Sequence, residues 1–347
     1  MINLSLGRPV MESFRTDPLC QAVEAAWKAG LVVVVAAGNE GRDNTYGNQG
    51  YGTIQSPGND PLAITVGAMR TMNTFQRSDD LMATYSSKGP TAIDQIVKPD
   101  LVAPGNSLMA PAPAATSELA QELAANFVPE NEYRLGGDPL KRTSYFRLSG
   151  TSVAAPIVSG AVALLIGRDG KLTPDQVKAR LMKTATKTYR AAVKGTDPVT
   201  GAVYSTVEDI FAKGAGYLNI DAALKNTDLG TGLAASPKAV YDAATKSVRL
   251  VGNTSVIWGE MARTSGTSVI WGESVIWGES VIWGESVIWG EALKVVGGVS
   301  VIWGEQSPWS DPSTAGFSVI WGESVIWGES VIWGERTPLA LMGRGEK

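Results

Sequence analysis

The chain has 347 residues, of which 44% are hydrophobic and 18% charged, and its formal net charge at pH 7 is −4. This size and apolar content allow one large α/β domain plus an appendage, while no apolar run approaches the roughly 20 residues of a membrane-spanning helix. The single cysteine, Cys20, excludes an internal disulfide, and the absence of histidine argues against a zinc site.

The N-terminal part predicts a strand–helix–strand unit. Strands are expected over residues 2–6 and 31–37, and the continuous apolar residues of the second are typical of a buried parallel strand. Between them we expect a helix with Asp17 as N-cap and Pro18 at its first position, ending at Gly30. Its predicted apolar stripe consists of Leu19, Ala22, Val23, Ala26 and Trp27. Cys20 is expected to pack within this helix rather than to react.

Residues 107–148 contain an Ala/Pro-rich stretch and a candidate short helix over residues 116–126, and they predict a surface insertion without an assigned role. Farther along, Thr173-Pro174-Asp175-Gln176 predicts the capped start of a packing helix over residues 174–184.

Residues 150–160 read Gly-Thr-Ser-Val-Ala-Ala-Pro-Ile-Val-Ser-Gly, and they place Ser152 at the start of a helix predicted over residues 153–166. A helix N-terminus offers free N–H groups and a partial positive charge, which suits a serine nucleophile whose transition state carries an oxyanion. Taken alone, however, a Gly-Thr-Ser sequence is more often an ordinary helix cap. In the same way, Asn39 before Glu-Gly is by itself typical of a turn.

Residues 226–254 are rich in Gly, Ala, Asp and Thr and predict a linker before a repetitive tail over residues 255–347. The hexapeptide Ser-Val-Ile-Trp-Gly-Glu occurs nine times in this tail, starting at Ser255, Ser268, Ser274, Ser280, Ser286, Ser300, Ser318, Ser324 and Ser330. Its even period suits either long strands or short strands stacked in a solenoid. The tryptophan array could bind carbohydrate or a cell surface, or the repeats could be a tandem expansion without a binding role. Its 11 acidic against 5 basic residues argue against nucleic-acid binding.

Together these segments resemble the subtilisin-like serine proteases. The resemblance rests on residues 150–160, 31–41 and 2–7, and on further matches at 62–68, 85–90, 98–105 and 214–219. It implies a partial subtilisin-like three-layer α/β fold with a mostly parallel sheet over residues 1–225. It also implies that Ser152 is the nucleophile and that the side-chain amide of Asn39 donates to the oxyanion.

The resemblance further implies protein or peptide substrates that pair along two backbone segments. The substrate-binding residues would be Ser5, Leu6 and Gly7 on one side and Ala36, Ala37 and Gly38 on the other. Glycine and alanine suit this role because they let a peptide main chain approach closely and add itself as a strand.

Two catalytic residues of the family, an aspartate and a histidine, belong upstream of residue 2, and the sequence has no histidine at all. We therefore expect negligible peptidase activity from this chain alone. The first strand should leave an unpaired outer edge, so aggregation or a need for the missing N-terminal part is expected. The family resemblance allows calcium, although no ligand spacing identifies its residues, and it favours secretion although no signal peptide is visible.

Two hypotheses follow for the function. In the first, the chain is the C-terminal part of a subtilisin-like endopeptidase whose start was lost, acting through an acyl-enzyme on Ser152. In the second, it is a non-catalytic surface or binding protein that presents the tryptophan repeats on a protease scaffold.

Overall fold

The computed structural model describes residues 1–251, apart from residues 46, 143, 191, 231 and 243–246, and it also describes Glu346. The predicted tail over residues 255–347 therefore lies, except for Glu346, outside the described residues.

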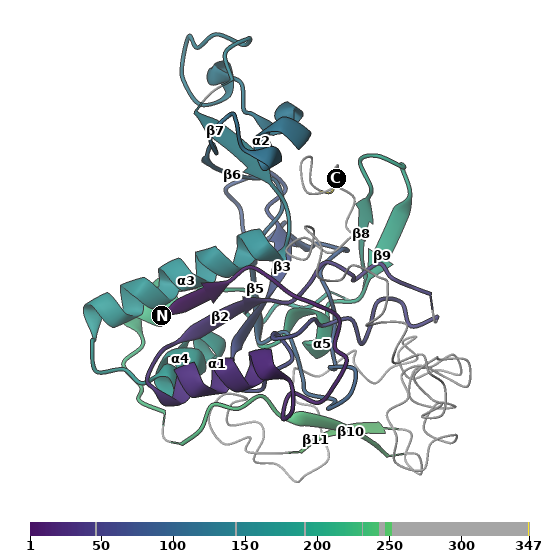
Figure 1. The fold of residues 1–347 in the computed structure, drawn as a ribbon, viewed down its shortest axis with the longest axis vertical. Coiled ribbons are helices and arrows are strands. Elements are labelled where there is room, and N and C mark those ends of the chain that lie inside the picture. Colours follow the sequence, from purple (N-terminus) through teal and green to yellow (C-terminus); the bar gives the residue numbers. More distant parts are fainter. Residues whose placement is uncertain are drawn as a thin grey trace.

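A five-stranded sheet forms the centre of the fold (Figure 1). Its strands are β1 (Ile2–Leu4), β2 (Val33–Ala36), β3 (Ile64–Arg70), β4 (Leu81–Met82) and β5 (Leu101–Pro104). The pairs β1–β2, β2–β3 and β3–β5 are parallel, whereas β4 pairs antiparallel with β3. The α/β class and the mostly parallel sheet predicted from the sequence are thus confirmed. Among the described strands β1 pairs only with β2, so it forms one edge of the sheet.

The predicted strand–helix–strand unit is present, with shorter strands. β1 ends at Leu4 rather than at residue 6 because Ser5 turns toward another partner, described below. Helix α1 (Pro18–Lys28) starts as expected: the Asp17 side chain accepts the amide of Leu19, and Pro18 occupies the first turn.

The buried face of α1 differs from the predicted stripe. Val23 and Trp27 are buried as expected, but Leu19 is 39% exposed and Ala22 is also exposed. Cys20, which is 0% exposed, takes the inner position instead. Residues 20, 23 and 27 lie on one helix face. The buried face therefore includes Cys20 and leaves out Leu19 and Ala22, which the prediction had placed on it. Burial raises the pKa of the Cys20 thiol, in agreement with its predicted packing role.

Helix α3 (Thr151–Arg168) packs across β1, β2, β3 and β5 (Figure 1). Within the described part of the chain it is the one helix whose length and hydropathy would suit a membrane span. Its packing across four strands is that of a core helix. It begins two residues earlier than predicted, so that Ser152 is its second residue rather than its cap.

Further helices complete the core. Helix α4 (Pro174–Thr184) has the predicted bounds and capping box, in which Thr173 and Gln176 bind each other's backbone amides. Helices α5 (Ile210–Lys213) and α6 (Ile220–Lys225) follow, and α6 contacts both α3 and α4.

Residues 107–148 project from the body of the molecule, at the top of Figure 1. They contain the antiparallel pair β6 (Leu108–Pro111) and β7 (Tyr145–Leu148), helix α2 (Glu118–Glu122), and the 3-10 turns η1 (Ala124–Asn126) and η2 (Glu130–Glu132). A second antiparallel pair consists of β8 (Val193–Thr196) and β9 (Val203–Thr206).

The stretch predicted as a linker is packed against the domain in its described part. It contains the antiparallel pair β10 (Lys238–Asp242) and β11 (Ser247–Val251). Ala234, Ser236 and Ala239 are buried, and Val97 donates its amide to the carbonyl of Pro237. The composition of this stretch suggested a boundary because its small residues are common in linkers, but here they allow close packing.

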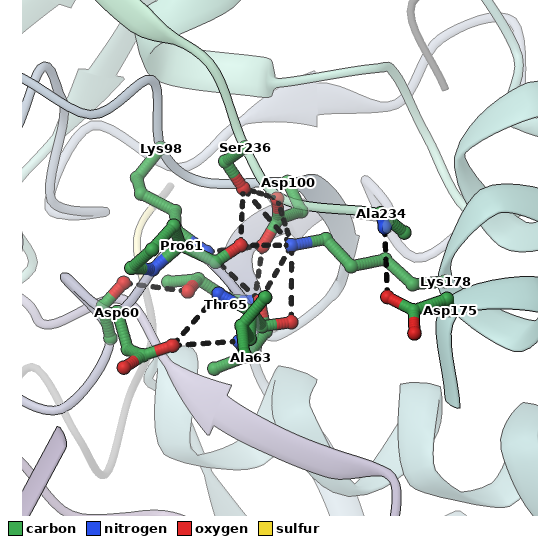
Figure 2. A network of polar contacts seen from close by, with 12 residues as sticks. Asp60, Pro61, Ala63, Thr65, Lys98, Asp100, Asp175, Lys178, Ala234 and Ser236 are labelled. Carbon is green, nitrogen blue, oxygen red and sulfur yellow. Dashed lines mark hydrogen bonds and ion pairs between the residues drawn. The ribbon is translucent and has the colours of Figure 1, made fainter. Parts of the chain in front are cut away.

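A buried charged network lies at the amino ends of β3 and β5 (Figure 2). The ammonium of Lys178, from α4, lies 3.0 Å from Asp100 Oδ1 and 3.0 Å from Ser236 Oγ. It also donates to the carbonyls of Pro61, Leu62 and Ala63, at 2.8, 3.2 and 3.0 Å. The ammonium is therefore surrounded by oxygen atoms.

The carboxylate of Asp100 is equally well bound. Asp100 Oδ2 lies 2.7 Å from Lys98 Nζ and 2.7 Å from the amide of Thr65, while Ser236 Oγ donates to Oδ1 at 2.5 Å. Burial alone would raise the pKa of Asp100, but Lys178 and Lys98 outweigh burial and hold the pKa below its usual value. For Lys178, burial lowers the pKa to about 7, although Asp100 acts in the opposite direction.

Candidate functional site

The predicted site residues meet where the carboxyl ends of two parallel strands approach the start of α3. Ser5 follows β1, Asn39 comes three residues after β2, and Ser152 is the second residue of α3. The carboxyl ends of parallel strands are the usual place for a binding site in α/β proteins, because the loops there converge on helix N-termini.

Ser152 and Ser5 are joined by two hydrogen bonds. The hydroxyl of Ser5 donates to the carbonyl of Ser152 at 2.7 Å, and the hydroxyl of Ser152 donates to the carbonyl of Ser5 at 3.3 Å. Ser152 is only partly buried. The predicted nucleophile is thus held against the segment predicted to bind substrate.

Asn39 is fixed by Thr151, the neighbour of the serine. Its side-chain oxygen accepts the amide of Thr151 at 2.9 Å and the Thr151 hydroxyl at 3.1 Å. The same hydroxyl accepts the amide of Gly38 at 3.1 Å. With its oxygen occupied in this way, Asn39 presents its Nδ2 donor in a set direction.

Gly150 leaves open a space beside this donor. A Cβ atom at Gly150 would lie 3.5 Å from Asn39 Nδ2 and 3.7 Å from the amide nitrogen of Ser152. Within the described residues, neither donor has a hydrogen-bond acceptor. Gly150 has φ of 144°, a conformation that favours glycine. Two N–H donors therefore converge beside Gly150, at the positively polarised start of α3.

No proton acceptor of ordinary basicity contacts the serine in the described part of the chain. The one acceptor bound by Ser152 Oγ is the carbonyl of Ser5, which does not take up a proton at neutral pH. The 347 residues contain no histidine. The structure therefore brings the predicted nucleophile and the predicted oxyanion donors together, without a histidine base from these residues.

The two glycines of the predicted substrate-binding segments face one side chain, that of Gln55. A Cβ at Gly7 would lie 2.5 Å from Gln55 Oε1, and a Cβ at Gly38 would lie 2.9 Å from Gln55 Cγ. Gln55 is partly exposed, and its backbone amide donates to the carbonyl of Ala37. Gln55 was not among the predicted site residues, because no periodicity or motif marks a single glutamine in an irregular loop.

The remaining predicted residues lie along the same two segments. Ala36 and Ala37 are buried, and Ala37 donates its amide to the carbonyl of Val66. Leu6 is partly buried and lies between Ser5 and Gly7. The structure thus brings the two segments together around Gln55, while the two alanines belong to the interior of the sheet.

Metal binding has no candidate of the usual kind in the described residues, which contain no group of three or more Asp, Glu, Cys or His side chains. The oxygen-rich cage at the amino ends of β3 and β5 holds the ammonium of Lys178. Calcium binding by this chain stays a prediction from family resemblance.

Comparison with known proteins gives a consistent family match. Residues 1–203 match the Subtilase family. The chain is 38% identical to the serine protease AprX of Bacillus subtilis (strain 168) over 193 residues, covering 55% of this chain and 38% of AprX. It is 29% identical to subtilisin DY of Bacillus licheniformis over 223 residues, covering 64% of this chain and 56% of that protein. The chain therefore spans about two fifths to a little over half of these relatives.

The structure of the patellamide maturation protease PatA aligns at a TM-score of 0.40 with 24% identity, over 64% of this chain and 61% of that protein.

Proposed function

Because the chain belongs to the subtilase family, we propose that its site is that of a serine endopeptidase in which Ser152 forms the acyl-enzyme. The hydroxyl of Ser152 would attack the scissile carbonyl, and the carbonyl oxygen would become an oxyanion beside Gly150. Water would then release the acyl group. Protein or peptide chains are the substrates that this chemistry implies.

The convergence of two donors beside Gly150 is the observation that carries this proposal. The Asn39 side chain and the Ser152 amide lie 3.5 and 3.7 Å from the same point, and neither is satisfied within the described residues. Donors held in place before the reaction stabilise a developing negative charge without any cost of reorganisation. An ordinary helix cap does not need a second donor from another loop.

The proposal includes negligible activity for these residues alone. A serine hydroxyl is a weak nucleophile until a base removes its proton, and the sequence offers no histidine for this role. Loss of triad members in a subtilisin lowers turnover by up to about 10⁶, a value borrowed from that enzyme. We propose that the base comes from outside these 347 residues.

Gln55 is proposed to shape the pocket for the residue on the acyl side of the cleaved bond. It lies between Gly7 and Gly38, the glycines of the two substrate-binding segments. Its amide group can donate and accept hydrogen bonds, so a polar side chain would find a partner there. An extended peptide would pair with the backbone of the two segments.

The test supplies the base from solution. Ser152 should react very slowly with a fluorophosphonate, and imidazole should increase the labelling rate in proportion to its concentration, because it accepts the hydroxyl proton. The label is located by mass spectrometry of the digested chain. Ser152→Ala should abolish labelling, while Ser205→Ala, at an exposed serine of β9, provides the matched control for serine removal.

Two outcomes would contradict the proposal. Labelling as fast as in a complete subtilase without imidazole would disprove the missing base. A labelling rate that does not depend on imidazole, or labelling of many serines, would disprove an organised site and favour the non-catalytic binding protein.

A further inference from the structure

The side chain of Glu346 is buried although this residue is next to last in the sequence. It lies at the carboxyl ends of the strands, among side chains from four separate segments. We call this group the Glu346 pocket; it consists of Arg42, Arg70, Thr84 and Asn106.

Asn106 binds the main chain of Glu346. Its Nδ2 donates to the carbonyl of Glu346 at 3.0 Å, and its Oδ1 accepts the amide of Glu346 at 2.6 Å. Such a two-point contact resembles the pairing of adjacent strands, and it fixes the position of a chain segment whatever its side chain. Asn106 also adjoins Gly105, whose carbonyl accepts the amide of Gly150, so the pocket borders the support of the serine site.

Thr84 and the two arginines recognise the carboxylate. The amide and hydroxyl of Thr84 each donate to a different carboxylate oxygen of Glu346, both at 2.7 Å. Arg42 Nη2 lies 3.6 Å from Oε1, and Arg70 Nε lies 3.9 Å from Oε2. This set of donors suits a glutamate, since it supplies positive charge and two well-placed hydrogen bonds.

The charges in this pocket balance only when Glu346 is present. Arg70 is 2% exposed, and the side chain of Arg42 is 12% exposed. Asp197 pairs with Arg42 at 2.7 Å, which leaves the guanidinium of Arg70 to be matched by Glu346. A buried guanidinium without a carboxylate is costly, so the pocket favours a negatively charged occupant.

A glycine in β8 leaves the room that the carboxylate needs. A Cβ added to Gly195 would lie 1.1 Å from Glu346 Oε1, a distance at which the two atoms cannot coexist. Gly195 does not have the positive φ that restricts a position to glycine, so its backbone could accept alanine. Glycine at position 195 is therefore needed for the space that the Glu346 carboxylate occupies, and not for an unusual backbone conformation.

We propose that the Glu346 pocket is a docking site for a glutamate-containing segment and that its occupant is the C-terminal Glu346 of the same chain. Docking ties the chain at residue 346 to the carboxyl ends of the strands, independently of any catalytic role of Ser152. Each hexapeptide repeat also ends in Gly-Glu, the dipeptide found at residues 345–346. The repeats are thus chemical competitors for the same pocket, and the test separates them from the C-terminus.

The test measures hydrogen exchange of single backbone amides by NMR in the full-length chain. The Thr84 amide should exchange about tenfold faster or more in Glu346→Ala, since its acceptor is gone. The Ala83 amide donates to the carbonyl of Ala68 and should keep its rate, which makes it an internal control.

Gly195→Ala provides an independent way to empty the pocket, because it removes no charge and no hydrogen-bonding group. It should accelerate exchange of the Thr84 amide as much as Glu346→Ala does. The double variant should exchange no faster than either single one, since both remove the same contact. Gly167→Ala, at an exposed helix glycine with open space, is the matched control and should leave the Thr84 rate unchanged.

Added peptides identify the occupant. In Glu346→Ala, a peptide with the sequence of residues 339–347 should restore slow exchange of the Thr84 amide, whereas the same peptide with glutamine at the Glu346 position should not. Restoration by Ser-Val-Ile-Trp-Gly-Glu as strong as by the C-terminal peptide would overturn the C-terminal assignment. So would Thr84 protection that increases with protein concentration, which indicates a second copy. An unchanged Thr84 rate in Gly195→Ala would overturn the docking site itself.

Discussion

The two ends of the parallel sheet carry polar clusters of opposite character. At the amino ends of β3 and β5, Asp100 and Lys178 are fully buried, and every donor or acceptor that they present is bound by protein atoms. At the carboxyl ends, the site around Ser152 is only partly buried.

The site at the carboxyl ends also keeps donors without acceptors. Asn39 Nδ2 and the amide nitrogen of Ser152 lie 3.5 and 3.7 Å from one point beside Gly150, where a Cβ would stand, and neither has an acceptor among the described residues. A saturated network leaves nothing for a ligand to bind, whereas converging unsatisfied donors are arranged for an atom that arrives from outside. The degree of hydrogen-bond satisfaction therefore distinguishes the structural cluster from the candidate site, although both contain charged or polar groups at strand ends.

Removing the carboxylate of the amino-end network should have the largest effect. Asp100→Asn would remove the carboxylate that lies 2.7 Å from the ammonium of Lys98 and 3.0 Å from that of Lys178, both of which are buried. We expect the free energy of unfolding to fall by about 3–5 kcal/mol, measured by denaturant titration. The matched control is Asp221→Asn, since the Asp221 side chain is 74% exposed and pairs with Lys225 at the surface. The free energy of unfolding of this control should fall by no more than about 0.5 kcal/mol. An equal fall in both variants would refute the structural role of Asp100.

Removing the predicted oxyanion donor should affect reactivity most. The buried Thr151 also loses the acceptor of its amide and hydroxyl, so the free energy of unfolding should fall by about 1–3 kcal/mol. Asn39→Ala should lower the imidazole-dependent labelling rate of Ser152 by about 10²–10³, the loss found for such a donor in a subtilisin itself. Labelling kinetics and denaturant titration are measured on the same preparation. If Asn39→Ala unfolds more readily but Ser152 is labelled at the original rate, the role of Asn39 is structural and the proposed difference between the two ends of the sheet is wrong.

The carboxyl-end site was predictable from the sequence to a large extent, because its residues sit in short motifs with fixed local geometry. Ser152 and Asn39 lie in such motifs, and the structure brings them together through Thr151. Gln55 was not predictable, since its position between Gly7 and Gly38 depends on the path of a loop. Docking of Glu346 depends on contacts between distant segments, which no local pattern encodes.

The amino-end network was hidden for a different reason. Helix α4 was predicted with its correct bounds, from its cap and its proline. Lysine is rarely buried, so no local pattern predicted that Lys178 lies in the interior. Its burial follows from the carbonyls of residues 61–63 and from Asp100, which come together only in the folded sheet.

The pH dependence of stability should reveal the buried ammonium of Lys178. Its pKa is about 7 in the folded protein and about 10.4 in an unfolded chain, so the unfolded state binds more protons between these values. The free energy of unfolding should therefore rise from pH 7 to pH 9, by about 2 kcal/mol. Burial lowers the pKa of Lys88 to about 8, which acts in the same direction.

The measurement is denaturant titration at several pH values, and Lys178→Met should reduce the rise. Above about pH 10 buried tyrosines such as Tyr51 oppose it, because burial raises their pKa and the unfolded state loses their protons first. A rise of equal size in Lys178→Met would assign the pH dependence to other groups.

Weakening the cap of α4 should have the smallest effect and should stay confined to the amino end. Thr173→Ala removes the acceptor of the Gln176 amide, 3.2 Å away, and should lower the free energy of unfolding by about 1 kcal/mol. Thr173→Ser keeps the hydroxyl and should retain most of the stability. Because α4 carries Lys178 but contributes no group to the serine site, labelling of Ser152 should not change. A fall in labelling comparable to that in Asn39→Ala would mean that the two ends of the sheet are energetically coupled.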